Sequence, residues 1–142
     1  MSEVSGYLLD TNVTSETRKS RADRNVLAFL EALNESDPWI SVLTIGELWK
    51  GVAMRQRRDP DAAMRIGIWI EEIKQDFADR ILPIDTRVAR LWGTLSAERT
   101  RPAVDTMLAA TAIAHNLALV TRNTKDVQGI NVATINPWMN QR

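Results

Sequence analysis

The sequence has no cysteine and only one histidine, His115, among its 142 residues. Without cysteine the chain can form neither a disulfide bond nor a thiolate metal site, which suits a reducing compartment. It also has no excess charge of either sign, because 18 Lys and Arg residues balance 18 Asp and Glu residues. A protein that attracts nucleic acid through a general electrostatic field is usually basic. Any nucleic acid would therefore have to be held by local basic patches.

Long apolar runs are absent as well. The longest run of apolar and small residues, LAATAIA at 108–114, is far shorter than the roughly 20 residues that a membrane-spanning helix needs. The N-terminal stretch MSEVSG is polar and acidic, unlike a secretory signal. We therefore expect a cytoplasmic protein without a membrane partner. The length of 142 residues fits a single domain, 1–142.

What the sequence does contain is an alternation of short apolar runs with segments of helical spacing. Strands that alternate with helices favour a parallel sheet covered on both faces, so we expect an α/β/α sandwich with a central parallel sheet. The strands are expected at 7–9, 39–43, 80–84, 117–121 and 132–135, and the helices at 22–34 and 44–57, from Pro60 to Phe77, from Asp85 onward and from Pro102 onward. Thr44, Asp59 and Asp85 are the expected N-caps of three of these helices.

Four acids are expected at one edge of this sheet. In an open parallel α/β sheet, ligands bind beyond the carboxyl ends of the strands. Asp10 directly follows the first strand, and Glu47 falls in the first turn of the helix after the second strand. Asp126 comes six residues after the strand that ends at Val120, and Asp105 opens a helix that can face the same edge.

Clustered carboxylates repel one another and tend to become protonated unless a cation joins them. Oxygen ligands without cysteine or clustered histidine point to Mg²⁺ or Mn²⁺. Such an ion can make a bound water more acidic and stabilise displacement at phosphorus. Short polar neighbours suited to supporting hydrogen bonds are Thr11, Asn12, Thr121 and Asn123. Arg122 and Lys125, which flank the proposed edge, are candidates for phosphate contact.

Each acid also has an ordinary structural interpretation when it is taken alone. Asp10 and Asp126 are residue types that form turns, and Glu47 and Asp105 are favourable charges near helix starts. Two other classes of protein compete with a metal-dependent enzyme. A phospho-acceptor domain normally has a pair of adjacent acids after its first strand, whereas LLDTN offers one. A non-catalytic binding module would keep the fold without the chemistry.

Four sequence blocks resemble a known family. YLLDTNVTSE, SVLTIGELWKG, AVDTMLAATAIAHNLALVTRNTKDV and INPW together look like a PIN-domain ribonuclease, and more narrowly like the VapC or FitB-like toxins of type II toxin–antitoxin systems. The resemblance covers nearly the whole chain in order. It implies a compact α/β sandwich, Mg²⁺- or Mn²⁺-dependent cleavage of RNA, inhibition by a cognate antitoxin, and a homodimer.

The resemblance also assigns roles to particular residues. By motif, the family's acids correspond to Asp10 of LLDTN, Glu47 of IGELWKG and Asp105 of VDTMLAATA. The fourth position lies in TRNTKD, where we place it on Asp126 and keep Asn123 as the alternative. All four acids are expected to be both catalytic residues and metal ligands.

Overall fold

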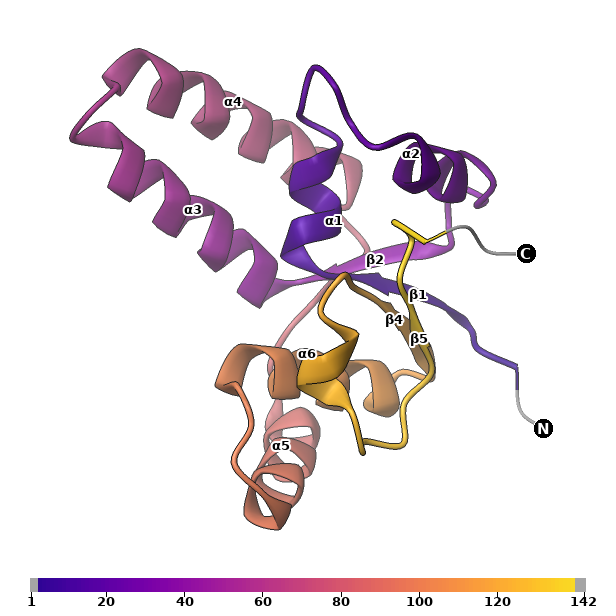
Figure 1. Ribbon diagram of the computed structural model, residues 1–142. Helices are drawn as coiled ribbons and strands as arrows, with labels where there is room; N and C mark the ends of the chain where they lie inside the picture. Colours follow the sequence, from indigo (N-terminus) through magenta and orange to yellow (C-terminus); the bar gives the residue numbers. More distant parts are fainter. Residues whose placement is uncertain (1–2, 140–142) are drawn as a thin grey trace.

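The computed structural model describes residues 3–139, and its helices and strands alternate as the sequence predicts (Figure 1). In chain order they are β1 (Gly6–Leu9), α1 (Thr11–Glu16), α2 (Arg24–Glu31), β2 (Pro38–Ser41), α3 (Val42–Gln56), α4 (Pro60–Asp76), β3 (Ile81–Leu82), α5 (Thr86–Glu98), α6 (Ala103–Ala114), β4 (Leu117–Val120), the short 3-10 helix η1 (Thr124–Val127) and β5 (Thr134–Ile135). No helix within the described range is both long and apolar enough to cross a bilayer.

The strands form one sheet in the order β3-β2-β1-β4-β5, and every neighbouring pair is parallel. Helices α1 to α4 lie on one side of the sheet, and α5 and α6 lie on the other (Figure 1). The predicted α/β/α sandwich with a central parallel sheet is therefore confirmed. Strand β1 lies in the middle of the sheet, with Leu9 opposite Val120 of β4. A residue that follows β1 consequently emerges at the centre of the carboxyl edge.

Strand β1 contributes to hydrophobic packing on both faces of the sheet, because successive strand residues point to opposite faces. Leu8 is fully buried in the core that faces α6, together with Leu108 and Leu119. Leu9 lies in the core on the other face, where it packs with Val13 of α1. The neighbours of β1 therefore hold it from both sides, and the acid at its end has a rigid support.

Helices α1 to α5 each begin after a side-chain cap, two of which were predicted, whereas α6 begins after Pro102 without one. Asp59 accepts a hydrogen bond from the Ala62 N–H at 3.1 Å, and Asp85 accepts one from the Val88 N–H at 3.0 Å. The prediction that Thr44 caps a helix was wrong. Helix α3 begins at Val42, because the Ser41 hydroxyl accepts a hydrogen bond from the Leu43 N–H at 3.0 Å. The strand expected at 39–43 accordingly ends at residue 41.

Helix α1 was not predicted at all. It has only six residues, too few for a hydrophobic period to be recognised. The next helix was expected at 22–34 but runs from Arg24 to Glu31, because Asp23 caps its start by accepting from the Asn25 N–H at 2.9 Å. His115, the lone histidine, lies just beyond the end of α6.

Candidate active site

Asp10 directly follows β1 and is only 4% exposed. Its Oδ1 accepts a hydrogen bond from the Thr11 N–H at 2.6 Å, which makes Asp10 the N-cap of α1. Its Oδ2 accepts from the Thr121 hydroxyl at 2.7 Å. Thr121 can reach it because β1 and β4 are paired and each residue directly follows its strand. Asp10 is thus both a helix cap and a carboxylate fixed at the edge of the sheet.

Glu47 extends from α3 to the start of α1, where the Thr11 hydroxyl donates a hydrogen bond to its Oε1. The Thr11 hydroxyl also lies 3.2 Å from the Thr44 hydroxyl. Because α3 begins at Val42, Glu47 lies in the second turn and not in the first turn as predicted. Sequence reasoning assigned Thr44 a capping role and missed this contact. The available signal was its spacing, since residues three apart share one face of a helix.

Asp105 lies in the first turn of α6, as predicted, and Asp126 lies in η1. The two carboxyl groups interact, and a proton shared between them is one of the causes that raise the pKa of Asp105. Asn123 ends the preceding turn: its N–H donates to the Thr121 hydroxyl at 3.0 Å, and its carbonyl accepts from the Asp126 N–H at 3.1 Å. Thr121 therefore links Asp10 to the turn that carries Asp126.

The electrostatics of the cluster reflect burial and mutual repulsion. Burial raises the pKa of Asp10, although the hydrogen bonds from Thr121 and Thr11 oppose the rise. The pKa of Asp105 is raised to about 7, first by burial, then by the hydrogen bond with Asp126, and then by the negative charges of Asp10, Asp126 and Glu47. Between residues 3 and 139, no Lys or Arg forms an ion pair with any of these four acids. The cluster therefore has negative charge without a matching cation.

A cavity of about 420 Å³ opens at this edge of the sheet. Its lining brings together three of the four predicted acids with three of the predicted supporting residues. The lining residues are Asp10, Thr11, Asn12, Glu47, the segment 102–105, and Asn123. Asn123 thus lines the cavity directly, whereas Asp126 acts on it through Asp105. Both candidates for the fourth position lie beside the other acids.

The side chains present fit a partly hydrated Mg²⁺ or Mn²⁺. As placed, no three acidic or histidine side chains in the described part of the chain are grouped closely enough to hold one ion together. Mg²⁺ does not require such a group, because it commonly binds to one or two carboxylates and keeps several water ligands. The cavity offers carboxylate, hydroxyl and amide oxygens together with negative charge that no ion pair within residues 3–139 compensates, a donor set that suits such an ion.

The two basic residues predicted to contact phosphate lie outside this cavity. Arg122 is exposed, and its guanidinium carbon stacks 4.8 Å from the ring centroid of Trp138. Lys125 lines a neighbouring cavity of about 430 Å³. Arg122 is therefore held against the C-terminal segment and does not point freely toward the acids.

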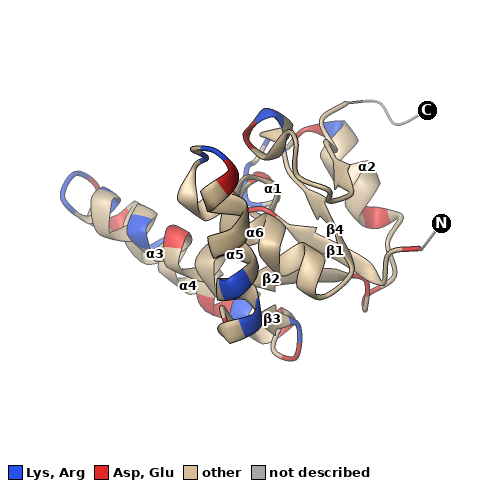
Figure 2. Ribbon diagram, turned by 90° about the horizontal axis from the view of Figure 1, so that it is seen from below, with Lys and Arg blue, Asp and Glu red and all other residues tan. Residues whose placement is uncertain are grey.

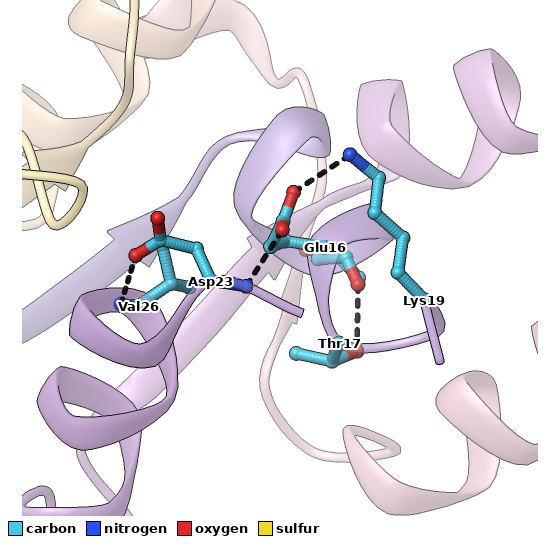
Figure 3. Close-up of polar contacts among 6 residues, drawn as sticks. Glu16, Thr17, Lys19, Asp23 and Val26 are labelled. Atoms are coloured by element: carbon cyan, nitrogen blue, oxygen red, sulfur yellow. Dashed lines mark hydrogen bonds and ion pairs between the residues drawn. The ribbon is translucent and has the colours of Figure 1, made fainter. Parts of the chain in front are cut away.

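A fifth acid, Glu16, lies outside the cluster and has ordinary partners (Figure 3). It is 5% exposed, accepts from the Asp23 N–H at 2.9 Å, and pairs with Lys19 Nζ at 2.9 Å. The hydrogen bond with Lys19, then that from Asp23, lowers its pKa, and the charge of Arg122 contributes further. Glu16 thus holds the loop between α1 and α2 in place.

An open parallel α/β sheet with a carboxylate cavity at the carboxyl ends of its strands defines the class of this protein. Within that class, the family model described as PIN domain matches residues 7–128. The chain belongs to the PIN domain family.

The chain matches two curated relatives over nearly the full length of each. It is 35% identical to Toxin FitB of Neisseria gonorrhoeae, over 92% of this chain and 97% of the relative. It is 34% identical to VapC ribonuclease Y4jK of Sinorhizobium fredii, over 92% and 96%.

Two solved structures are similar to the chain over most of its length. The crystal structure of FitAcB from Neisseria gonorrhoeae is similar with a TM-score of 0.84 and 34% identity, covering 93% of this chain and 98% of that one. A toxin–antitoxin complex from Klebsiella pneumoniae is similar with a TM-score of 0.67 and 29% identity, with the same coverage of 93% and 98%.

Proposed function

We propose that the protein is a metal-dependent endoribonuclease and the toxin of a toxin–antitoxin pair. The single observation that carries the proposal is the carboxylate cavity, which Asp10, Glu47 and Asp105 line together and in which no described basic side chain takes part. The similarity to a VapC ribonuclease and to the FitB toxin supports the choice of RNA as substrate and of the toxin role.

The side chains of this cavity would divide the work as follows. Asp10 and Asp105 are the proposed direct ligands of Mg²⁺ or Mn²⁺, and Thr121 and the Thr11 N–H hold Asp10 in a single orientation. When bound, the metal would make a water more acidic and would neutralise charge at the leaving oxygen of a phosphodiester.

The remaining two acids would have supporting roles, Glu47 inside the cavity and Asp126 next to it. Glu47, oriented by the Thr11 hydroxyl, would accept a proton from the attacking water. Asp126, through its hydrogen bond, would hold the Asp105 carboxyl in place. Asn12 and Asn123 would hydrogen-bond to substrate or to metal-bound water.

An antitoxin and a second copy of the chain are the proposed protein partners. A basic side chain from the antitoxin, most naturally an arginine, would pair with the carboxylates and compete with the metal. Large apolar side chains are exposed on the α3–α4 hairpin, which provides surface for association with protein. These side chains are Trp49, Met54, Met64 and Ile68. Both partners and the RNA would be encountered in the cytoplasm.

The test is an RNA cleavage assay on purified protein freed of any antitoxin. We expect cleavage with Mg²⁺ or Mn²⁺ and none with EDTA. Asp10→Asn should abolish cleavage, and Asp79→Asn is the matched control because the side chain of Asp79 is 92% exposed and lies outside the cavity. Full cleavage in EDTA, or by Asp10→Asn, would refute the proposed mechanism. Metal binding without cleavage of any RNA would instead favour a binding module.

A further inference from the structure

Two arginines converge on one glycine beside the carboxylate cavity. Arg99 and Arg101 lie in the loop between α5 and α6, where Figure 2 shows basic residues next to the end of α5. A Cβ placed on Gly129 would lie 3.7 Å from Nη2 of Arg101 and 3.7 Å from Nη1 of Arg99. Gly129 has a φ of +88°, a conformation that favours glycine. The absence of a side chain there leaves room for both guanidinium groups.

The charge of these two arginines is poorly compensated. The side chain of Arg101 is only 4% exposed, yet its Nε has no hydrogen-bond partner. Its Nη1 donates to the Leu95 carbonyl and contacts Glu98 at 3.4 Å, but Glu98 is itself mostly exposed to solvent. Arg99 forms no ion pair with any residue between 3 and 139. Glu98 is the one carboxylate that pairs with either arginine within residues 3–139, so the Nε of Arg101 and the exposed guanidinium of Arg99 can still bind an anion.

The arginine loop is continuous in the chain with one wall of the carboxylate cavity. The arginine loop continues directly into the segment 102–105, which lines the cavity and carries Asp105. Asn123 also lines the carboxylate cavity, while the residues after it line the neighbouring one of about 430 Å³, among them Lys125 and Gly129. Gly129, which both guanidinium groups approach, therefore lines the neighbouring cavity, and η1 lies between it and Asn123 in the chain.

We propose that Arg99 and Arg101 bind a phosphate of the RNA strand next to the phosphate that is cleaved. This inference rests on the proposed ribonuclease function. Guanidinium groups suit the task because each can donate two parallel hydrogen bonds to a phosphate. The electrically neutral chain would thus hold RNA at a positive site near the negative cavity, and Lys125, which lines the neighbouring cavity, would contact the strand as well. Recognition here is of the backbone and is independent of base sequence.

The test measures binding of a fluorescent single-stranded RNA oligonucleotide in EDTA, over a range of salt concentrations. Loss of one phosphate contact on a single strand should lower the magnitude of the slope of log affinity against log salt by about 0.7, or roughly fivefold in affinity at 0.1 M salt. We expect this loss for Arg99→Ala, and a partial loss of affinity for Arg101→Lys, which keeps the buried charge but removes the planar fork. Arg87→Ala, at the exposed opposite end of α5, should bind as the wild type does.

Cleavage by the wild-type protein with Mg²⁺, measured in parallel, separates this inference from the proposed function. If RNA is cleaved but Arg99→Ala and Arg101→Lys keep the wild-type affinity and slope, the phosphate site is refuted and the ribonuclease stands. If binding depends on both arginines but no RNA is cleaved, the phosphate site stands and the ribonuclease is refuted. Absence of RNA binding by the wild-type protein would overturn the phosphate site as well.

Discussion

Glu16 and Asp105 are two acids removed from solvent to different degrees, and their pKa values move in opposite directions. Glu16 is nearly fully buried, yet its pKa is lowered, because Lys19 and the Asp23 N–H stabilise its charge. Asp105 is less buried, yet its pKa is raised to about 7, because burial is reinforced by Asp126 and by other carboxylates. Burial alone therefore does not identify a functional acid. The partners of the carboxylate make the difference: Glu16 has donors that stabilise its charge, whereas Asp105 has acids that favour binding of a proton or a cation.

Both kinds of acid occur in one short motif. In YLLDTNVTSE, Asp10 caps the start of α1 and faces the cavity, whereas Glu16 ends α1 and holds the following loop. Asp10, which is proposed to take part in the chemistry, and Glu16, which holds the loop, thus lie at the two ends of the same six-residue helix. Changes at its two ends should have separable effects.

The largest expected effect is on RNA cleavage. Asp105→Asn should lower the cleavage rate by on the order of 10²- to 10³-fold, the size typical for removing one charge-stabilising group from an active site. Glu16→Gln should retain activity close to wild type once corrected for the folded fraction, because Glu16 lies outside the cavity. Steady-state cleavage assays on both variants make the comparison. Equal losses in the two variants would show that the cavity has no special role.

The next largest effect is on stability in the presence of Mg²⁺. A ligand that binds only the folded state stabilises it by about 2.7 kcal/mol at a concentration 100 times its Kd. Thermal unfolding of the wild type and of Glu16→Gln should shift upward with Mg²⁺, whereas Asp10→Asn and Asp105→Asn should not shift. A Mg²⁺ response that survives in both Asn variants would place the ion elsewhere.

The sequence predicted the fold well because the signals it uses are local. Pro60 after Asp59 and the cap at Asp85 each act within a few residues, and both were confirmed. The apolar runs marked all five strands, although β3 (Ile81–Leu82) and β5 (Thr134–Ile135) are shorter than expected. Helix α1 escaped because six residues are too few to show a period. The start of α3 was misplaced because Ser41 and Thr44 are both good caps, and only packing decides between them.

For the site, the sequence placed the acids at one edge but not the contacts among them. That Thr121 meets Asp10 follows from the pairing of β1 with β4, a contact 111 residues apart in the chain. The stacking of Arg122 on Trp138 could not be predicted, since it depends on where the C-terminal segment returns to the sheet. The position of Arg122 beside the motif predicted a contact with RNA, whereas in the structure its side chain contacts Trp138.

A third expected effect is a pair of opposite pH dependences in metal-free protein. An unfolded Asp has a pKa near 3.9, so between about pH 4 and 7 folded Asp105 keeps a proton that the unfolded chain has released. This stabilisation is present below about pH 4 and is lost as the pH rises toward 7. For Glu16 the folded pKa is lowered, so its stabilisation is present above the unfolded value of about 4.5 and is lost as the pH falls.

Thermal unfolding in EDTA between pH 3.5 and 8 measures both effects. In Asp105→Asn, the free energy of unfolding should no longer fall as the pH rises toward 7. In Glu16→Gln, it should no longer fall as the pH drops toward 3.5. Glu16→Gln should also cost about 1–2 kcal/mol near pH 7, because a charge-assisted hydrogen bond is replaced by a neutral one. The comparison between the two acids would be wrong if the variants changed the same side of the profile.

The smallest expected effect concerns Arg122, which is related both to the carboxylate cavity and to Glu16. It follows Thr121, the hydrogen-bond donor to Asp10, but its side chain stacks on Trp138 and its charge acts on Glu16. Arg122→Ala should therefore reduce the free energy of unfolding by about 0.5–1 kcal/mol, the size of an exposed cation–π contact. Urea unfolding measures that change, and Arg122→Lys is the control, since it keeps the charge but stacks less well.

For Arg122→Ala, we expect RNA affinity to fall only severalfold and the Mg²⁺ response to stay intact, since Arg122 does not line the cavity. Unchanged stability with a large loss of RNA affinity would instead make Arg122 a direct RNA contact that leaves Trp138 when the substrate binds.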